Sequence, residues 1–241
     1  MKILSIGNSF STDAHKYLHT ISKLNGEDIY TANLFIGGCS LEIHWTNVLE
    51  NNAYYDYEIN GNEAQEKISI ADALERNDWD IVTLQQVSGL SGIYKSYQPY
   101  LYNLAELVKS KLPDIKLCFH QTWAYEIDSE HPDFSNYNSS QQRMFDCIVS
   151  ASKQACKAID AQLIPTGTAI QTVRESIKEF DYKNGGMSLC RDSFHLSENY
   201  GRYTAAATWF KTLTGKNILT ETLHSMNPEL LKAINAVVNS L

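Results

Sequence analysis

The chain has 241 residues, a hydrophobic fraction of 43% and a formal net charge of −8 at pH 7. This length and apolar content suffice for a packed core, and no apolar run in the sequence is long enough to span a membrane. The acidic balance argues against a nucleic-acid partner, because phosphate backbones demand clustered Lys and Arg. We therefore expect no nucleic-acid partner and no membrane partner.

Five cysteines are scattered along the chain without a Cys-x-x-Cys pair. An odd number at irregular spacings is neither a disulfide framework nor a zinc site, so we expect buried free thiols. The amino terminus lacks the basic region and long apolar stretch of a signal peptide. This predicts a cytoplasmic protein, or a periplasmic or secreted one if a leader has been removed.

The first part of the chain predicts a strand, a helix and two further strands. Residues 2–7 form a short apolar run that ends at a glycine, which is typical of a buried strand. A helix is expected next, capped by Ser11 or Thr12 and closed by Gly26. The following expected strands cover residues 29–36 and 80–85.

The segment YYDYEINGNEAQEKISI, before the third expected strand, alternates aromatic and polar residues around Asn60-Gly61. An Asn-Gly pair in such a context is a hairpin signal, because both residues accept the positive φ of a type I′ turn. We expect a small β-hairpin insertion here.

The rest of the chain alternates helical and strand patterns. Helices are expected at residues 97–111, 139–159, 170–178, 197–214 and 228–240, and strands at 116–123 and 161–165. Asn227 can cap the last helix, with Pro228 at its first position. The alternation predicts an α/β fold: a three-layer α/β/α sandwich with a mostly parallel sheet of about five strands. No linker or repeat appears, so residues 1–241 are expected to form one domain.

Polar residues follow the expected strands, where open parallel sheets bind their ligands. The first strand ends in Gly-Asn-Ser, the second in Gly-Gly-Cys-Ser and the third in Gln-Gln-Val-Ser-Gly. Far downstream, Asp192 lies three residues before His195. Each feature alone has an ordinary explanation as a turn or a local side-chain pair, but together they form a known order of motifs.

The pattern resembles the SGNH (GDSL-type) hydrolase superfamily. SIGNSFS matches its first block, which carries the nucleophilic serine, with Asn8 in place of the usual Asp. NLFIGGCS matches the second block through Gly38, and RDSFHLS matches the D-x-x-H block without alteration. The runs GNSFS, GGCSL, LQQVSG, HQTWAY and RDSFHLS are similar to an uncharacterised bacterial branch, over nearly the whole chain.

The resemblance implies a Ser-His-Asp triad in which Ser9 is the nucleophile, His195 the base and Asp192 the group that orients it. The N–H groups of Ser9 and Gly38 are expected in the oxyanion hole. The third block departs from the family, because no G-x-N-D motif follows DIVTLQQ. Either a Gln amide replaces its Asn, or backbone groups alone form the hole. We select Gln86, which lies nearer the usual position and reaches one methylene further than Asn.

The expected activity is hydrolysis of small O-acyl esters, with O-acetylated carbohydrate as the preferred substrate. Aromatic residues near the strand ends could stack on a sugar ring, although core packing explains them equally well. The expected substrate-binding residues are Trp45, Gln121, Trp123 and Tyr125.

No metal and no cofactor are expected, because the sequence has no H-E-x-x-H, dinucleotide or P-loop motif. Since a fold does not determine function, a non-catalytic carbohydrate- or ligand-binding domain is the main alternative, and the missing Asn keeps it open. A flavodoxin-like or nucleotide-binding domain is a third hypothesis.

Overall fold

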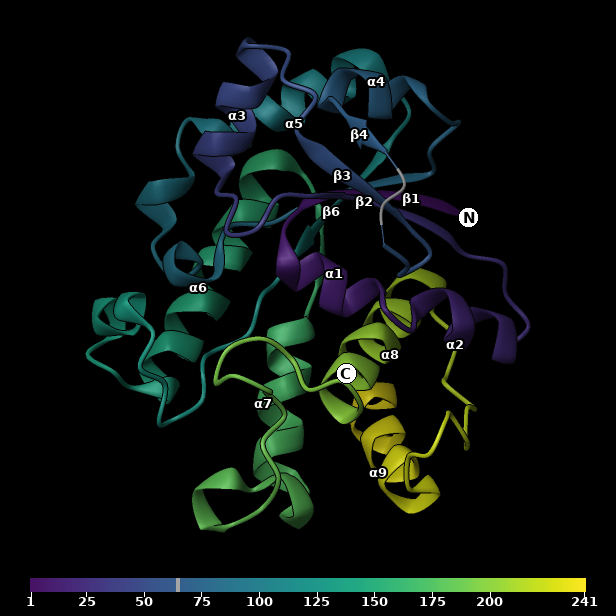
Figure 1. The fold of residues 1–241 in the computed structure, drawn as a ribbon, viewed down its shortest axis with the longest axis vertical. Helices are drawn as coiled ribbons and strands as arrows, with labels where there is room; N and C mark the ends of the chain where they lie inside the picture. Colours follow the sequence, from purple (N-terminus) through teal and green to yellow (C-terminus); the bar gives the residue numbers. More distant parts are fainter. Residues whose placement is uncertain (64–65) are drawn as a thin grey trace.

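The computed structural model describes residues 1–63 and 66–241 (Figure 1). Among these residues the chain forms one seven-stranded sheet in the order β4-β3-β2-β1-β5-β6-β7. Its strands are β1 (Lys2–Gly7), β2 (Tyr30–Phe35), β3 (Tyr55–Ile59), β4 (Lys67–Ile68), β5 (Ile81–Leu84), β6 (Lys116–His120) and β7 (Gln162–Ile164). Five adjacent strands of this sheet run parallel, which confirms the five expected strands; they are β2, β1, β5, β6 and β7.

The two additional strands come from the expected hairpin, which joins the sheet instead of forming a separate insertion. Strand β3 pairs antiparallel with β2, and β4 pairs antiparallel with β3. Asn60 and Gly61 have φ of 51° and 73°, as the turn requires. A Cβ on Gly61 would lie 2.8 Å from the backbone of Lys16, so glycine also permits close approach to α1. The sheet therefore has seven strands where about five were expected.

The α-helices are α1 (Ser9–His15), α2 (Leu18–Leu24), α3 (Leu41–Leu49), α4 (Ile70–Glu75), α5 (Tyr100–Lys111), α6 (Gln141–Ile159), α7 (Thr166–Ser176), α8 (Tyr200–Thr214) and α9 (Pro228–Asn239). The short 3-10 helices are η1 (Ser88–Leu90), η2 (Tyr94–Tyr97), η3 (Pro132–Tyr137), η4 (Lys178–Phe180) and η5 (Tyr182–Asn184). The first expected helix is two helices, and its cap is Asn8 instead of Ser11 or Thr12. Helices α3 and α4, capped by Ser40 and Ser69, were not predicted.

Helices cover both faces of the sheet and enclose two apolar cores. Helices α3, α4 and α5 lie on one face, and α1, α2, α7, α8 and α9 lie on the other (Figure 1). Helix α6 contributes Met144 and Ile148 to one core and Ala151 and Ile159 to the other. The architecture is the expected α/β/α sandwich, and the carboxyl ends of its parallel strands share one edge. No helix among the described residues is long and apolar enough to cross a membrane.

Three buried histidines bring a titratable group into these cores. His15, His44 and His120 are each at most 2% exposed. Burial lowers the pKa of all three to about 3, because desolvation disfavours the imidazolium form. Each ring is therefore neutral in the folded protein across the pH range in which an unfolded histidine takes up its proton.

We predict that the protein loses stability as the pH falls below about 6.5. Between pH 6.5 and about 3, these three histidines bind protons in the unfolded chain but not in the folded chain, so acid favours unfolding. At about pH 5.5 each histidine should cost about 1.4 kcal/mol. Urea denaturation measures this, and His44→Gln should remove about a third of the loss. A free energy of unfolding that does not change with pH would contradict the prediction.

Candidate active site

Ser9 stands where β1 passes directly into α1. The buried Asn8 side chain accepts the Phe10 N–H at 3.0 Å, and Ser11 Oγ accepts the Asn8 N–H at 3.0 Å. This reciprocal cap satisfies two free donors and starts the helix immediately after the strand. A Cβ on Gly7 would lie 2.1 Å from Ser11 Oγ, which explains the glycine. Ser9 is thereby held in the first turn of α1 at the carboxyl edge of the sheet.

Ser9, His195 and Asp192 form a continuous hydrogen-bonded chain. His195 Nε2 lies 2.8 Å from Ser9 Oγ, and His195 Nδ1 lies 2.8 Å from Asp192 Oδ2. Burial raises the pKa of Asp192, but hydrogen bonds from His195 and neighbouring backbone outweigh it and hold that pKa below its usual value. The ionised carboxylate keeps a proton on Nδ1, so Nε2 is free to accept the proton of Ser9.

Asp13 of α1 links the helix with Ser9 to the segment with Asp192 and His195. Its carboxylate is 1% exposed and accepts from Arg191 Nη1 at 3.0 Å, Leu196 N–H at 2.8 Å and Arg202 Nε at 2.7 Å. Arg191 Nη1 also donates to the Leu196 carbonyl. One buried anion thus holds both ends of the segment with Asp192 and His195 against the helix with Ser9. Sequence analysis missed it, since its only signal is an acidic residue beside Ala14 on the buried helix face.

Gln85 supports the Ser9 turn from within the core. Its Nε2 donates to Asn8 Oδ1 at 2.7 Å, and its Oε1 lies 2.7 Å from His120 Nδ1. Because the Gln85 oxygen can only accept, His120 Nδ1 carries the proton in this pair. The Asn8 Nδ2 group donates to the Cys39 carbonyl at 3.0 Å. Asn8 therefore connects the Ser9 turn to the loop after β2 and to the end of β5.

Gln86 has a different role from the expected third oxyanion donor. Its Nε2 contacts Ser96 at the carbonyl (3.2 Å) and at Oγ (3.1 Å). Its Oε1 accepts the N–H groups of Leu41 and Val87 at 3.0 and 2.9 Å. Both ends of the amide are occupied in bridging loops after β2 and β5. The expectation is corrected: Gln86 holds loops together, and its donor is directed to Ser96.

The two backbone donors expected in the oxyanion hole are the N–H groups of Ser9 and Gly38. Gly38 lies in the exposed turn that Asn8 ties down, and its φ of 65° favours glycine. Across residues 1–63 and 66–241, the N–H groups of Ser9 and Gly38 make no hydrogen bond within the protein. Ser9 is half-buried and Gly38 is exposed.

Residues 2–239 match the family model described as a domain of unknown function, DUF4886. The chain belongs to the DUF4886 family. A DUF4886 family protein from Bacteroides uniformis has 37% identity and a TM-score of 0.92, over 100% of this chain and 93% of that one. No curated protein matches the chain.

More distantly related solved structures share the fold of this chain. A candidate SGNH hydrolase from Slackia heliotrinireducens has 20% identity and a TM-score of 0.60, over 88% of this chain and 98% of that one. A variant of Axe2, an acetylxylan esterase from Geobacillus stearothermophilus, has 13% identity and a TM-score of 0.52, over 89% and 92%. The fold is that of the SGNH hydrolases, which confirms the resemblance.

Three of the substrate-binding residues expected in this chain are buried. Gln121, Trp123 and Tyr125 are at most 1% exposed, because β6 ends at His120 and the chain then runs through the core. A sugar ring stacks only on an accessible aromatic face, and the Gln121 amide is occupied by Ser152 and Thr168, so the prediction was wrong for these residues. Trp45, on α3, is half-buried and stays a prediction.

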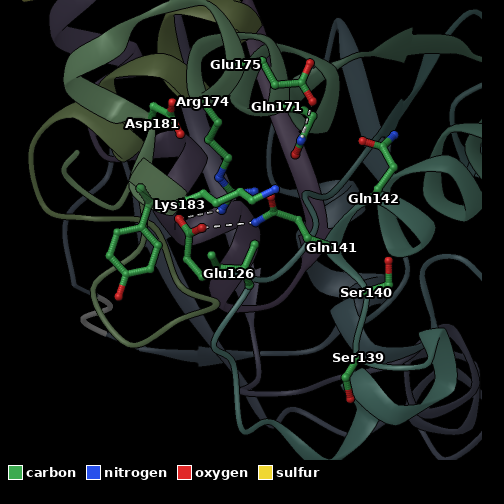
Figure 2. A pocket seen from close by; sticks show the side chains of 12 residues that line it. Glu126, Ser139, Ser140, Gln141, Gln142, Gln171, Arg174, Glu175, Asp181 and Lys183 are labelled. Atoms are coloured by element: carbon green, nitrogen blue, oxygen red, sulfur yellow. Dashed lines mark hydrogen bonds and ion pairs between the residues drawn. The ribbon is translucent and has the colours of Figure 1, made fainter. Parts of the chain in front are cut away.

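The structure also has a polar cavity of about 590 Å³, which lies between the start of α6, the end of α7 and η5 (Figure 2). Arg174 Nη2 donates to Glu126 Oε1 at 3.0 Å, and Gln141 Nε2 donates to Glu126 Oε2 at 3.1 Å. Ser9 and His195 are not among its lining residues. Within the described ranges, no three His, Cys, Asp or Glu side chains are grouped to hold a metal ion.

We predict that Asp13→Asn destabilises the protein by about 3 kcal/mol, because the partly buried Arg191 and Arg202 lose the buried carboxylate that lies between them. Glu75→Gln is the matched control: Glu75 pairs with Lys111 on the surface, at 65% exposure, and the change should cost at most about 0.5 kcal/mol. Urea denaturation of both variants measures the difference. Equal losses in the two would show that Asp13 does not hold the segment.

Proposed function

We propose that this DUF4886 protein is a serine hydrolase that cleaves small O-acyl esters. The observation that carries the proposal is the chain of two 2.8 Å contacts from Ser9 Oγ through His195 to Asp192. A serine hydroxyl is a weak nucleophile until a base within hydrogen-bond reach removes its proton. The first contact supports His195 as that base, and the second supports Asp192 as the carboxylate that orients its ring.

The reaction follows from these positions in two stages. In the first, Ser9 Oγ attacks the ester carbonyl carbon while His195 Nε2 takes the hydroxyl proton. His195 then gives that proton to the departing alcohol, which leaves the acyl group on Ser9. In the second stage His195 deprotonates a water molecule that attacks the acyl carbon, and the proton returns to Ser9 as the carboxylic acid departs. Asp192 stays ionised and stabilises the imidazolium in both stages.

The oxyanion hole in this proposal consists of backbone donors alone. The Ser9 and Gly38 N–H groups have no partner in the described protein, and Asn8 holds the loop of Gly38 to the Ser9 turn. Donors that are fixed before the reaction stabilise the developing negative charge without reorganisation. The Gln86 amide, occupied by Ser96, is left out of this hole.

O-acetylated carbohydrate is the substrate class that we propose. Support comes from an acetylxylan esterase among the proteins of the same fold. Trp45 is the half-buried aromatic that remains of the expected sugar-stacking residues, and it lies on the helix that follows the Gly38 turn. A non-catalytic binding domain is the outcome if the wild-type protein neither hydrolyses acetyl esters nor reacts with a serine-directed reagent.

We predict that Ser9→Ala and His195→Ala each abolish hydrolysis of para-nitrophenyl acetate and labelling by a fluorophosphonate probe. The two residues act as one unit, so the double variant should be no worse than either single one. Asp192→Asn should lower turnover by at most about 10⁴-fold, because the ring loses its orienting partner but not its basicity altogether. Near-normal turnover in Ser9→Ala would exclude Ser9 as the nucleophile.

We predict that kcat/KM falls at acidic pH, because a protonated His195 cannot accept the Ser9 proton. The pKa of Asp192 lies below its usual range, so this carboxylate stays ionised and the acid limb should follow a single proton. Initial rates on para-nitrophenyl acetate give the profile, and circular dichroism at each pH confirms that the protein is folded. A flat profile down to mildly acidic pH would contradict a histidine base.

A further inference from the structure

Trp123 contacts both halves of the candidate active site from inside the core. Its ring stacks on Phe10, the residue after Ser9, with centroids 4.1 Å apart and planes 11° apart. Its Nε1–H donates to the carbonyl of Phe194, the residue before His195, at 2.7 Å. The Trp123 side chain is 0% exposed, whereas Phe194 is half-buried. One rigid ring system therefore spans from the nucleophile's neighbour to the base's neighbour.

The Phe194 carbonyl belongs to the peptide unit that leads into His195, and this unit is held at both ends. Trp123 binds its C=O, while Asp192 Oδ1 accepts its N–H at 2.7 Å. Two opposed hydrogen bonds fix the rotation of a peptide plane, because turning the plane lengthens both. The plane in turn sets where the His195 Cα lies and from which direction its imidazole approaches Ser9.

A second contact from the same core segment restrains the preceding peptide. The Glu126 N–H donates to the Ser193 carbonyl at 2.7 Å. Ser193 has a φ of 71°, a left-handed conformation that a serine rarely adopts without outside support. The chain after β6 therefore holds two successive carbonyls of the segment with Asp192 and His195, and Trp123 holds the one nearer the imidazole.

We propose that Trp123 is a positioning residue that sets the contact between Ser9 and His195. The inference rests on the proposed function, since it matters only if His195 serves Ser9. Trp123 touches no reacting atom, and it acts through Phe10 and through the Phe194–His195 peptide. Its indole N–H is the group that distinguishes this role from simple filling of the core.

Trp209 provides a matched control for the experiment. It is also 0% exposed, lies in the same apolar core, and its Nε1 has no hydrogen-bond partner in the described protein. Trp123→Phe and Trp209→Phe remove the same atoms from equally buried sites. Only the first removes a hydrogen bond that reaches the candidate active site.

The test measures both variants on para-nitrophenyl acetate at a temperature where each is folded. We expect Trp123→Phe to lower kcat about 10- to 100-fold with KM changed less than about twofold, because a small displacement of the base acts on the chemical step. The rate of fluorophosphonate labelling should fall in parallel. Trp209→Phe should keep kcat within about threefold of wild type, whatever its loss of thermal stability. Equal kcat in the two variants would overturn the proposal.

Two further measurements keep this result independent of folding and of the proposed function. If Trp123→Phe does not fold, benzothienylalanine at position 123 removes the N–H with almost no change of shape and should give the same loss of kcat. Proton NMR follows the His195 Nδ1–H that is bonded to Asp192, and its solvent exchange should accelerate in the Trp123 variant alone. Should the wild-type protein prove inactive, this exchange still tests the positioning. If the solvent exchange of the His195 Nδ1–H in the Trp123 variant matches that of the wild type, Trp123 does not position His195.

Discussion

The buried carboxylate of Asp13 is the constraint on which the candidate active site depends. Ser9 and His195 are 186 residues apart in the chain, and the segment with His195 has no regular secondary structure of its own. A loop of that kind would sample many arrangements unless its ends were fixed. Asp13 fixes them because burying its charge is unfavourable until Arg191, Arg202 and the Leu196 N–H surround it. The electrostatic requirement of one carboxylate is thus converted into the geometry of a site.

Much of this arrangement could be predicted from the sequence, because the relevant signals are local. Strand β1 has the predicted bounds, and Asn227 caps α9 with Pro228 at its first position. The motif around Ser9 and the D-x-x-H motif lie where a parallel sheet brings loops to a common edge. Their side chains meet within hydrogen-bond distance, as the order of motifs indicated. That prediction rested on the resemblance of the motif order to the SGNH superfamily, because each motif alone also has an ordinary explanation as a turn or a local side-chain pair.

The features that sequence analysis missed depend on how deeply a side chain is buried or belong to elements too short to show a periodic pattern. A motif gives the order of residues but not their burial, so Trp123 and Tyr125 were placed at a surface when the chain after His120 lies in the core. Gln86 was assigned by its place in the chain, but the choice depended on which loop its amide would meet. Helix α4 spans only Ile70–Glu75, too short for a helical period to show. The hairpin strands joined the sheet because β2 offered an open edge, which no local pattern reveals.

The amide at position 8 also explains a departure from the usual motif of the superfamily, which has Asp there. The side chain must serve two acceptor-seeking groups, the Phe10 N–H and Gln85 Nε2, and one donor-seeking group, the Cys39 carbonyl. An amide has one atom of each kind, whereas an ionised carboxylate would set an oxygen against the carbonyl oxygen of Cys39. The turn with Gly38 therefore favours Asn over Asp at position 8, because the Cys39 carbonyl needs a donor and a carboxylate has none to offer.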